Sequence, residues 1–426
     1  MELSLHLLML FALDWAEFAV RWLHVITAIA WIGSSFYFIA LDLGLWRDRD
    51  LPEGVHGEEW QVHGGGFYHI RKYLVAPKEL PEHLTWFKWE SYATWMSGFA
   101  LLVLVYYLGA DLYLVDAEKT ELSGLMAIGL SLASIVLGWL GYHHLCQSKL
   151  GENSTSLMVI LYVLIVLLSY GFDQVFTGRA AFLHLGAITA TIMSANVLMV
   201  IIPNQRIVVA DLKAGRTPDA KYGKIAKQRS THNNYLTLPV IFLMLSNHYP
   251  LAFATEYSWV IAALVFLMGV TIRHYFNTLH ARGGNPRWTW AATAFIFLVI
   301  MMLSLLPLMQ QDQTDQDAQI QDHLMQDNQR VMQLAAHPDF EAVQDIVMGR
   351  CAMCHAAEPY YDGDGIRDIL WAPKAIILDT AQDIALNAKG IITQSALSHA
   401  MPPANVSYME DEERRLLLRW YLESRY

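Results

Sequence analysis

The chain has 426 residues, of which 54% are hydrophobic and only 16% are charged. A soluble globular protein has about a quarter of its residues charged, so this composition favours a membrane protein over a wholly soluble one. The net charge of -11 argues against a nucleic-acid partner, because binding a phosphate backbone requires a basic surface. Three cysteines are too few for a disulfide framework in a chain of this length.

From Asp14 to about Met309, long apolar stretches alternate with polar loops. Each stretch is close to the roughly 20 residues that a helix needs to cross the hydrocarbon core. We expect eight spanning helices, at about 15–42, 87–110, 122–143, 156–177, 181–203, 235–249, 254–276 and 288–309. The sixth is the weakest, because it is short and contains Pro239. The first lacks the basic start of a signal peptide, so it should remain as a spanning helix.

Basic residues concentrate in alternate loops of this region. The loops from Arg47 to Lys88 and from Arg206 to Arg229 are the richest, whereas the loop from Asp111 to Glu121 is acidic. Cytoplasmic loops of membrane proteins carry an excess of Lys and Arg. The basic loops are therefore predicted to lie in the cytoplasm, with both termini outside.

Charged and imidazole side chains are costly inside a membrane, so each one is a candidate functional residue. Glu17, Arg21 and His24 lie at i, i+4 and i+7 of the first helix, hence on one face. Glu17 and Arg21 would equally suit an ion pair near the headgroups, and His24 would equally suit a hydrogen-bonded core position. His184 in the fifth helix is expected at the same outer depth as His24.

A second layer of histidines is expected toward the cytoplasmic side. Its members are His143, His232 and His274. Two layers of histidines on facing helices would suit b-type haems, and the alternative is that several are interfacial or loop residues. Asn196, with Asn233 and Asn234, adds amide groups that would line a polar cavity and pair with the edges of a planar heterocycle.

The composition changes after Met309. Residues 310–337 are rich in Gln and Asp and predict a linker, and a compact domain is predicted from 338 to 426. In this domain Cys351-Ala352-Met353-Cys354-His355 is the attachment pattern of a c-type haem, in which two thiols bond the porphyrin and the histidine becomes an axial iron ligand. A structural zinc site would need further Cys or His ligands close by, and Cys146 lies far upstream.

The second axial ligand of the iron is predicted to be Met401. It lies between the haem motif and an expected closing helix at 410–423, and the two prolines that follow it would stiffen its loop. Met409 is the competing sulfur, and core packing is the alternative role for Met401. The two cysteines of the motif are expected to hold one covalent haem c, with His355 and Met401 on its iron. Since c-type haem is attached on the periplasmic side of a bacterial inner membrane, this motif agrees with the loop charges in placing the domain and both termini in the periplasm.

Several stretches of the membrane domain resemble one family. These are Arg21-Trp22-Leu23-His24, Lys88-Trp89-Glu90, Ile201-Ile202-Pro203-Asn204-Gln205 and His232-Asn233-Asn234-Tyr235-Leu236-Thr237-Leu238-Pro239. Together with the c-type motif they resemble the bacterial membrane-bound cytochrome c urate oxidases, or urate hydroxylases, over nearly the whole chain. The resemblance implies an all-α protein, in which an eight-helix transmembrane bundle at 1–309 precedes a small class I-like cytochrome c domain.

The same resemblance implies oxidation of urate to 5-hydroxyisourate. Electrons would pass to the protein's own haem and then to a respiratory acceptor, either a soluble cytochrome c or a terminal oxidase, and membrane lipid would surround the bundle. By our own assignment Arg21 would stabilise the urate anion, and His24 or His184 would act as the base. If urate enters from the cytoplasm, the inner histidine layer becomes the better site. Because the reaction releases two electrons, either the haem is reoxidised between transfers or the membrane domain holds another one-electron centre.

Two other classes of function remain open at the level of sequence. One is an electron-transfer cytochrome whose membrane domain is an anchor or oxidises quinol. The other is a transporter with a fused redox domain, for which a broken helix and intramembrane polar residues would also be expected.

Overall fold

The computed structural model divides the chain into two compact units, Met1–Met309 and Gln310–Tyr426, and each unit is described by itself. The described residues are 2–48, 50–73, 77, 80–116, 119–253, 255–310, 332–356, 376–397, 401–402, 405 and 407–424. Most of the predicted linker therefore lies outside the described residues.

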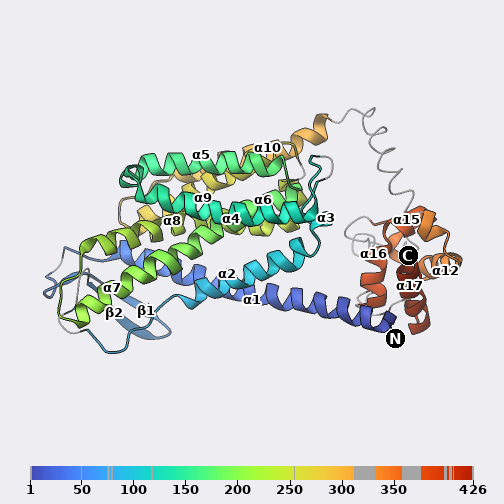
Figure 1. The fold of residues 1–426 in the computed structure, drawn as a ribbon, viewed down its shortest axis with the longest axis horizontal. Coiled ribbons are helices and arrows are strands. Elements are labelled where there is room, and N and C mark those ends of the chain that lie inside the picture. The colour runs from blue at the N-terminus through green and yellow to red at the C-terminus, as the bar shows by residue number, and fades with distance from the viewer. Residues whose placement is uncertain are drawn as a thin grey trace. The chain divides into compact units, whose positions relative to one another are not determined.

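The first unit is a bundle of long helices (Figure 1). Their bounds are α1 Glu2–Gly44, α2 Trp89–Leu101, α4 Gly124–Gln147, α5 Ser154–Asp173, α6 Gly178–Ala195, α7 Ile202–Lys213, α8 Ala220–Leu245, α9 Ser258–His280 and α10 Trp288–Gln310. A π-helical turn, Leu102–Tyr107, continues α2, another, Asn196–Ile201, joins α6 to α7, and the short α3 covers Ala110–Tyr113. Side chains that accept a backbone N–H begin α4, α5, α6 and α8, and they are Ser123, Asn153, Thr177 and Asp219.

Within the described residues, six helical segments are long and apolar enough to cross a membrane. They are Trp15–Gly44, Gly124–Gln147, Ser154–Asp173, Gly178–Lys213, Ser258–His280 and Trp288–Leu306. These segments confirm the predicted class, a helical membrane domain. The stretches predicted at 87–110 and 235–249 are also helical, but they are not among the six. The segment before residue 235, predicted to be a loop, is largely helical, since α8 already begins at Ala220. The first half of α8 is rich in Lys, which is why its sequence resembles a loop.

The prediction of an all-α chain misses a β-hairpin. Strand β1, Val55–His63, pairs antiparallel with β2, Gly66–Tyr73, inside a segment expected to be a loop. Gly64 and Gly65 form its two-residue turn with φ of 59° and 79°, the left-handed backbone that such a turn requires and glycine adopts without strain. The Gly-Gly pair between aromatic and β-branched residues was the available signal.

Helix α8 continues through Pro239 because α9 carries a glycine opposite it. A Cβ on Gly269 would lie 2.5 Å from Pro239 Cδ and 2.7 Å from its Cγ. The missing side chain therefore lets the rigid proline ring pack against α9, and the predicted interruption of this helix does not occur.

Gly269→Ala is expected to lower the melting temperature of the protein in detergent. Overpacking against a rigid ring costs roughly 1–3 kcal/mol, which exceeds the gain of about 1 kcal/mol in helix propensity. Gly141→Ala on α4 is the matched control, because a Cβ there meets nothing within 4 Å and should leave the melting temperature equal or higher. Equal melting temperatures for the two variants would contradict the close approach of α8 and α9.

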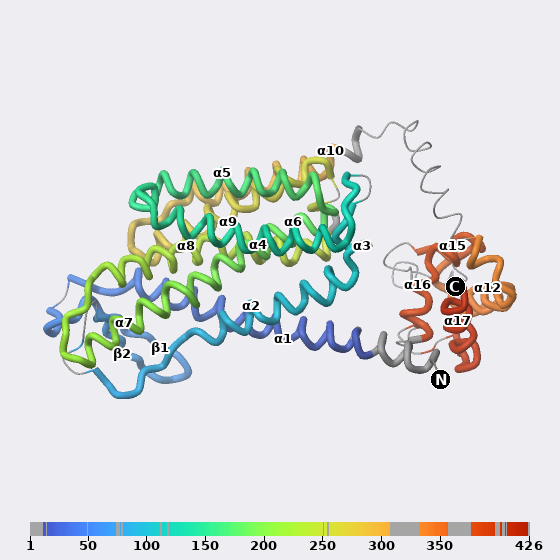
Figure 2. Tube along the Cα trace, in the orientation of Figure 1, coloured from blue at the N-terminus to red at the C-terminus, as the bar shows by residue number. Residues whose placement is uncertain are grey.

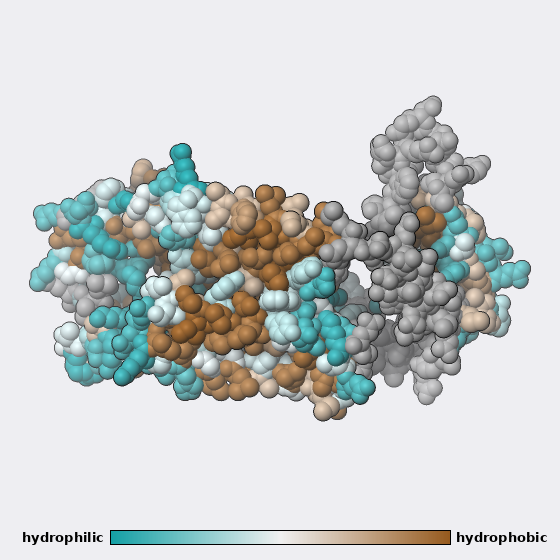
Figure 3. Space-filling view, turned by 90° about the horizontal axis from the view of Figure 1, so that it is seen from above, coloured by the Kyte–Doolittle hydropathy of each residue, from teal (hydrophilic) through white to brown (hydrophobic). Residues whose placement is uncertain are grey.

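The surface of this unit is apolar over its middle. Figure 3 shows apolar side chains gathered there, with polar ones toward the end that carries the hairpin. β1, β2 and the turn between α7 and α8 lie at that end, and α3 lies at the other (Figure 2). Side-chain contacts tie the basic loops together: Lys72 and Lys227 pair with Asp42 at the end of α1, and Arg282 donates to the Gly44 carbonyl at 2.8 Å. The two most basic predicted loops thus share one end of the bundle.

The second unit is a small helical domain. Its helices are α12 Phe340–Arg350, α13 Ala352–His355, α15 Ala381–Leu386, α16 Ala388–Ile391 and α17 Asp411–Glu423, with a π-helical turn at Ile392–Leu397. Val343 and Val347 of α12 pack with Leu417 and Trp420 of α17, and all four are buried. Trp420 Nε1 also donates to the Leu334 carbonyl at 3.0 Å. This core packs α12, which leads into the Cys-x-x-Cys-His motif, against α17.

Candidate functional site

The outer residues predicted to be catalytic already have protein partners. Arg21 forms an ion pair with Glu17, one turn away on α1, and both side chains are more than a third exposed. His24 Nδ1 donates to the Thr94 carbonyl at 3.0 Å and lies 3.1 Å from Ser97 Oγ. The two residues therefore adopt the ion-pair and core-histidine arrangements that the sequence left as alternatives.

His184 is a fully buried residue with both ring nitrogens engaged. Nδ1 donates to the Ala180 carbonyl at 2.7 Å, and Nε2 lies 2.6 Å from Ser131 Oγ. The ring of Phe176 stacks on the imidazole with centroids 4.8 Å apart. This arrangement leaves no free nitrogen for a substrate or an iron, so the geometry favours a structural role.

The inner histidines do not form one layer. His274 is exposed on α9, and the neighbouring Arg273 is the buried residue. His143 is half-buried and its ring lies 5.0 Å from the Trp139 ring. Only His232 joins the polar interior, where its Nδ1 lies 2.8 Å from Tyr142 Oη.

A buried polar cluster does form at this level, between α4, α8 and the π-helical turn after α6. Asn196 Nδ2 donates to Tyr142 Oη at 3.0 Å and to Asn233 Oδ1 at 2.9 Å, and Asn233 Nδ2 donates to the Met193 carbonyl at 2.9 Å. Asn196 begins a π-helical turn, a local widening that often marks functional sites. We call Tyr142, Asn196, Arg229, His232 and Asn233 the inner cluster.

Arg229 is the charged member of the inner cluster and the residue that sequence reasoning missed. It is 1% exposed, and its guanidinium lies 4.9 Å from the centroid of the Tyr142 ring. Nη2 donates to the His143 carbonyl at 3.4 Å, and the guanidinium also lies close to the Tyr142 hydroxyl and the Cys146 thiol. Among the described residues, no atom accepts from Nε or Nη1 with full hydrogen-bond geometry. Among the described residues no carboxylate lies within ion-pair distance of it. Burying an unpaired charge is costly, so the cluster suits an anionic ligand.

A second buried guanidinium, that of Arg273, lies on α9 next to Asn234 of α8. Arg273 donates from Nη2 to Asn277 Oδ1 at 3.0 Å and from Nε to Asn234 Oδ1 at 3.4 Å, and it stacks 4.0 Å from the Phe36 centroid. Asn277 Nδ2 also donates to Asn234 Oδ1 at 2.9 Å. The polar interior of the first unit therefore contains two buried guanidinium groups, one on α8 and one on α9.

The second unit presents the residues that would hold a c-type haem. Cys351 and Cys354 are free, half-buried thiols, and burial raises the pKa of Cys351 to about 11. His355 Nδ1 donates to the Ile376 carbonyl at 2.9 Å, and the His355 carbonyl accepts from Leu378 N at 2.7 Å. These bonds orient the imidazole and leave Nε2 free for a metal. The donor set therefore fits the predicted haem.

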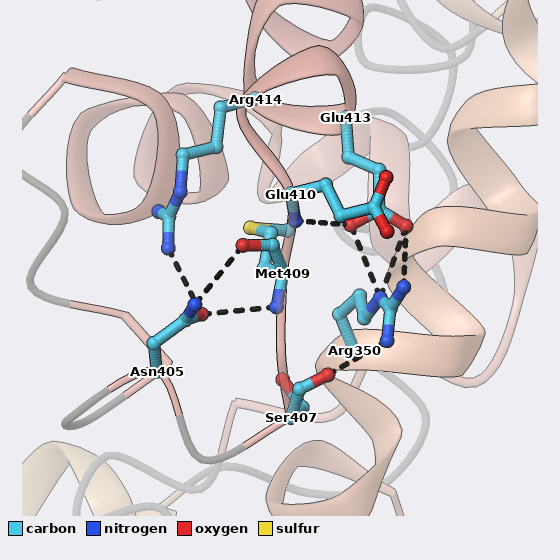
Figure 4. A network of polar contacts seen from close by, with 7 residues as sticks. All are labelled: Arg350, Asn405, Ser407, Met409, Glu410, Glu413 and Arg414. Atoms are coloured by element: carbon cyan, nitrogen blue, oxygen red, sulfur yellow. Dashed lines mark hydrogen bonds and ion pairs between the residues drawn. The ribbon is translucent and has the colours of Figure 1, made fainter.

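A polar network joins Arg414 of α17 to Asn405 and the backbone of Met409 (Figure 4). Arg414 of α17 donates to the Met401 carbonyl at 3.0 Å and to Asn405 Oδ1 at 3.2 Å, and Asn405 in turn bonds the backbone of Met409. The competing sulfur of Met409 belongs to a side chain that is buried in the core of this unit, whereas Met401 is half-buried. The geometry thus favours Met401 as the iron ligand.

Acidification is expected to loosen α17 through Glu413. Burial is the largest single effect and would raise the pKa of Glu413. Hydrogen bonds from Arg350, at 3.0 and 3.1 Å, and from the Glu410 backbone N–H, together with the charges of Arg350 and Arg414, outweigh burial, and the pKa is lowered. A carboxylate with a lowered folded pKa stabilises the fold above its unfolded pKa of about 4.3 and loses that contribution as pH falls through the folded value.

Hydrogen exchange of the α17 amides in the intact protein, corrected for intrinsic rates, would measure this effect between about pH 6 and pH 3.5. The wild type should lose protection below about pH 4.3, and Glu413→Gln should show lower protection at pH 6 with a flatter profile. Identical profiles for the two proteins would count against the ion pair.

The first unit is thus a helical membrane domain with a buried cationic cluster, and the second is a small helical domain that carries the Cys-x-x-Cys-His motif. The profile of the family described as urate oxidase N-terminal matches residues 10–304. The match covers more than half of the chain, which therefore belongs to the urate oxidase N-terminal family, and membership indicates a urate-related oxidase function. No curated protein and no solved structure was found to match the chain.

Proposed function

We propose that this protein is a membrane-bound urate oxidoreductase that converts urate to 5-hydroxyisourate. The observation that carries the proposal is the buried guanidinium of Arg229, which has no carboxylate partner among the described residues, in a chain whose residues 10–304 match the urate oxidase N-terminal family. Urate is an anion near neutral pH and can supply the missing negative charge. The inner cluster is therefore the substrate site, in preference to the outer residues Arg21, His24 and His184.

Each member of the inner cluster has a chemical task in this proposal. Urate and one water give 5-hydroxyisourate, two protons and two electrons. Arg229 binds the anion through its unpaired N–H groups. The Tyr142 hydroxyl lies 2.8 Å from His232 Nδ1, so the pair can take up a proton from urate or from water. Asn233, bonded to the Met193 carbonyl, holds Asn196 in place.

The second unit takes up the electrons in the same proposal. Cys351 and Cys354 hold one haem c covalently, and His355 and Met401 ligate its iron. When bound, this haem supplies a one-electron acceptor that can relay electrons to a soluble cytochrome c or a terminal oxidase. Eight helices span a bacterial inner membrane, with the basic loops in the cytoplasm and both termini in the periplasm. This arrangement requires electrons to cross the bundle, and the predicted b-type haem, a candidate for that step, stays a prediction.

An anaerobic assay on the purified, oxidised protein tests the proposal. Adding urate should reduce the haem, visible as a change in its absorbance, and should consume one urate for every two electrons accepted. Haem that stays oxidised with urate but is reduced by a quinol would overturn the proposal in favour of a quinol-oxidising cytochrome. A pyridine haemochrome assay on the same sample counts c-type and b-type haems.

A further inference from the structure

The unpaired buried atoms of the inner cluster include one hydrogen-bond acceptor and two donors. Asn196 Oδ1 is buried and has no donor, whereas Arg229 Nε and Nη1 are buried and have no acceptor. The cluster therefore lacks one N–H donor and at least one acceptor. Unpaired buried polar groups are costly, so these atoms describe what a ligand must bring.

The assignment of the Asn196 oxygen follows from its neighbours. Asn233 must donate from Nδ2 to the Met193 carbonyl, because a carbonyl can only accept. Asn233 Oδ1 then faces Asn196 and must receive a donor, which is Asn196 Nδ2 at 2.9 Å. Turning the Asn196 amide over would bring two oxygens together. Its Oδ1 is thus fixed as an acceptor that needs an N–H.

The two requirements together exclude anions that carry no hydrogen-bond donor. A carboxylate would satisfy Arg229 but has no hydrogen to donate, so it would leave Asn196 Oδ1 unpaired, and a neutral amide would leave the charge of Arg229 unpaired. A planar ring in which an N–H adjoins a carbonyl, and which carries a negative charge, satisfies both.

We infer that Asn196 and Arg229 together select anionic cyclic ureides, with Asn196 Oδ1 accepting from a ring N–H and Arg229 donating to a ring oxygen. This inference rests on the proposed function, because it assumes that the inner cluster is the urate site. It adds that Asn196 determines specificity: the residue distinguishes a ring that presents an N–H from one that does not.

Binding of urate and of its four mono-N-methyl derivatives to the full-length protein tests this inference. The protein is first reduced without oxygen, so that bound urate is not oxidised, and affinities are measured by calorimetry. One methyl derivative should bind the wild type about 10-fold or more weakly than urate, because it cannot donate to Asn196. Asn196→Ala should bind urate about 10-fold more weakly than the wild type does. In this variant, the same methyl derivative should bind nearly as tightly as urate.

Asn285→Ala, which removes an exposed amide from the loop between α9 and α10, is the matched control and should bind all five compounds as the wild type does. If urate binds, but no methyl position loses more affinity in the wild type than in Asn196→Ala, the inference is overturned and the proposed function stands. Acetate, an anion with no hydrogen-bond donor, would also overturn it if it competes as well as urate. Failure of the wild type both to bind and to oxidise urate would instead sink the proposed function. If Asn196→Ala does not fold, the methyl series and the acetate competition on the wild type decide the matter.

Discussion

Arg229→Gln is expected to raise KM for urate by roughly 100-fold, because losing one partner of a buried charge pair costs about 2–5 kcal/mol. The free protein should show an equal or higher melting temperature, since the substitution removes a buried charge that has no carboxylate partner. Steady-state kinetics and thermal unfolding with and without urate measure both effects. Urate should raise the melting temperature of the wild type and leave that of the variant nearly unchanged.

Two further substitutions serve as a control and as a test of the alternative site. Arg216 is an exposed arginine just after α7 that pairs with Asp211 of that helix. Arg216→Gln should leave KM unchanged. Arg21→Gln tests the outer site that the sequence also suggested. A larger rise in KM for Arg21→Gln than for Arg229→Gln would move the substrate site to the outer end of α1 and contradict the assignment of the inner cluster.

Met401→Ala is expected to lower the reduction potential of the haem by on the order of 0.1 V, a modest part of the roughly 0.8 V range that axial ligands set. A thioether ligand favours the reduced iron, so its loss favours the oxidised form. The long-wavelength absorbance from sulfur to iron should also disappear. Redox titration followed by absorbance measures both.

Met409→Leu is the matched control for this experiment. Met409 is buried among apolar side chains, and leucine has a similar volume, so the potential and the spectrum should stay as in the wild type. An unchanged spectrum in Met401→Ala, together with a lost absorbance in Met409→Leu, would exchange the roles of the two methionines. Arg414 should matter indirectly, because it holds the Met401 carbonyl.

The local sequence pattern was sufficient to predict most helices of the first unit. It was insufficient in segments whose polar residues resemble those of a loop. The long apolar runs that became α4, α5, α9 and α10 could be recognised from composition, because a spanning helix must be apolar along its length. The first half of α8 has the composition of a loop, since its lysines resemble those of a solvated segment. The hairpin differs from its prediction for a related reason: a basic segment between two spanning helices also has the composition of a loop.

The residues of the candidate site were harder to predict from the sequence than the helices. Arg229, His232 and Asn233 are spaced i, i+3 and i+4, which is a signal for one helix face, but this signal could be used only after the residues were assigned to a helix. Arg273 and His274 are adjacent, and the sequence favoured the histidine. The packing of α9 against α8 buries the arginine and leaves the histidine exposed.

The sequence by itself determined the apolar character of the membrane domain and the Cys-x-x-Cys-His motif, because both depend on residue type and on spacing along a few turns of chain. Only the tertiary structure decided which polar side chains meet. His184 is hydrogen-bonded by Ser131 from a different helix. Arg229 has no carboxylate partner within the part of the chain that the structure describes, although Asp42 lies close enough to pair with Lys227, two residues before it. Whether a buried group is paired depends on contacts between helices distant in sequence, and no local pattern carries that information.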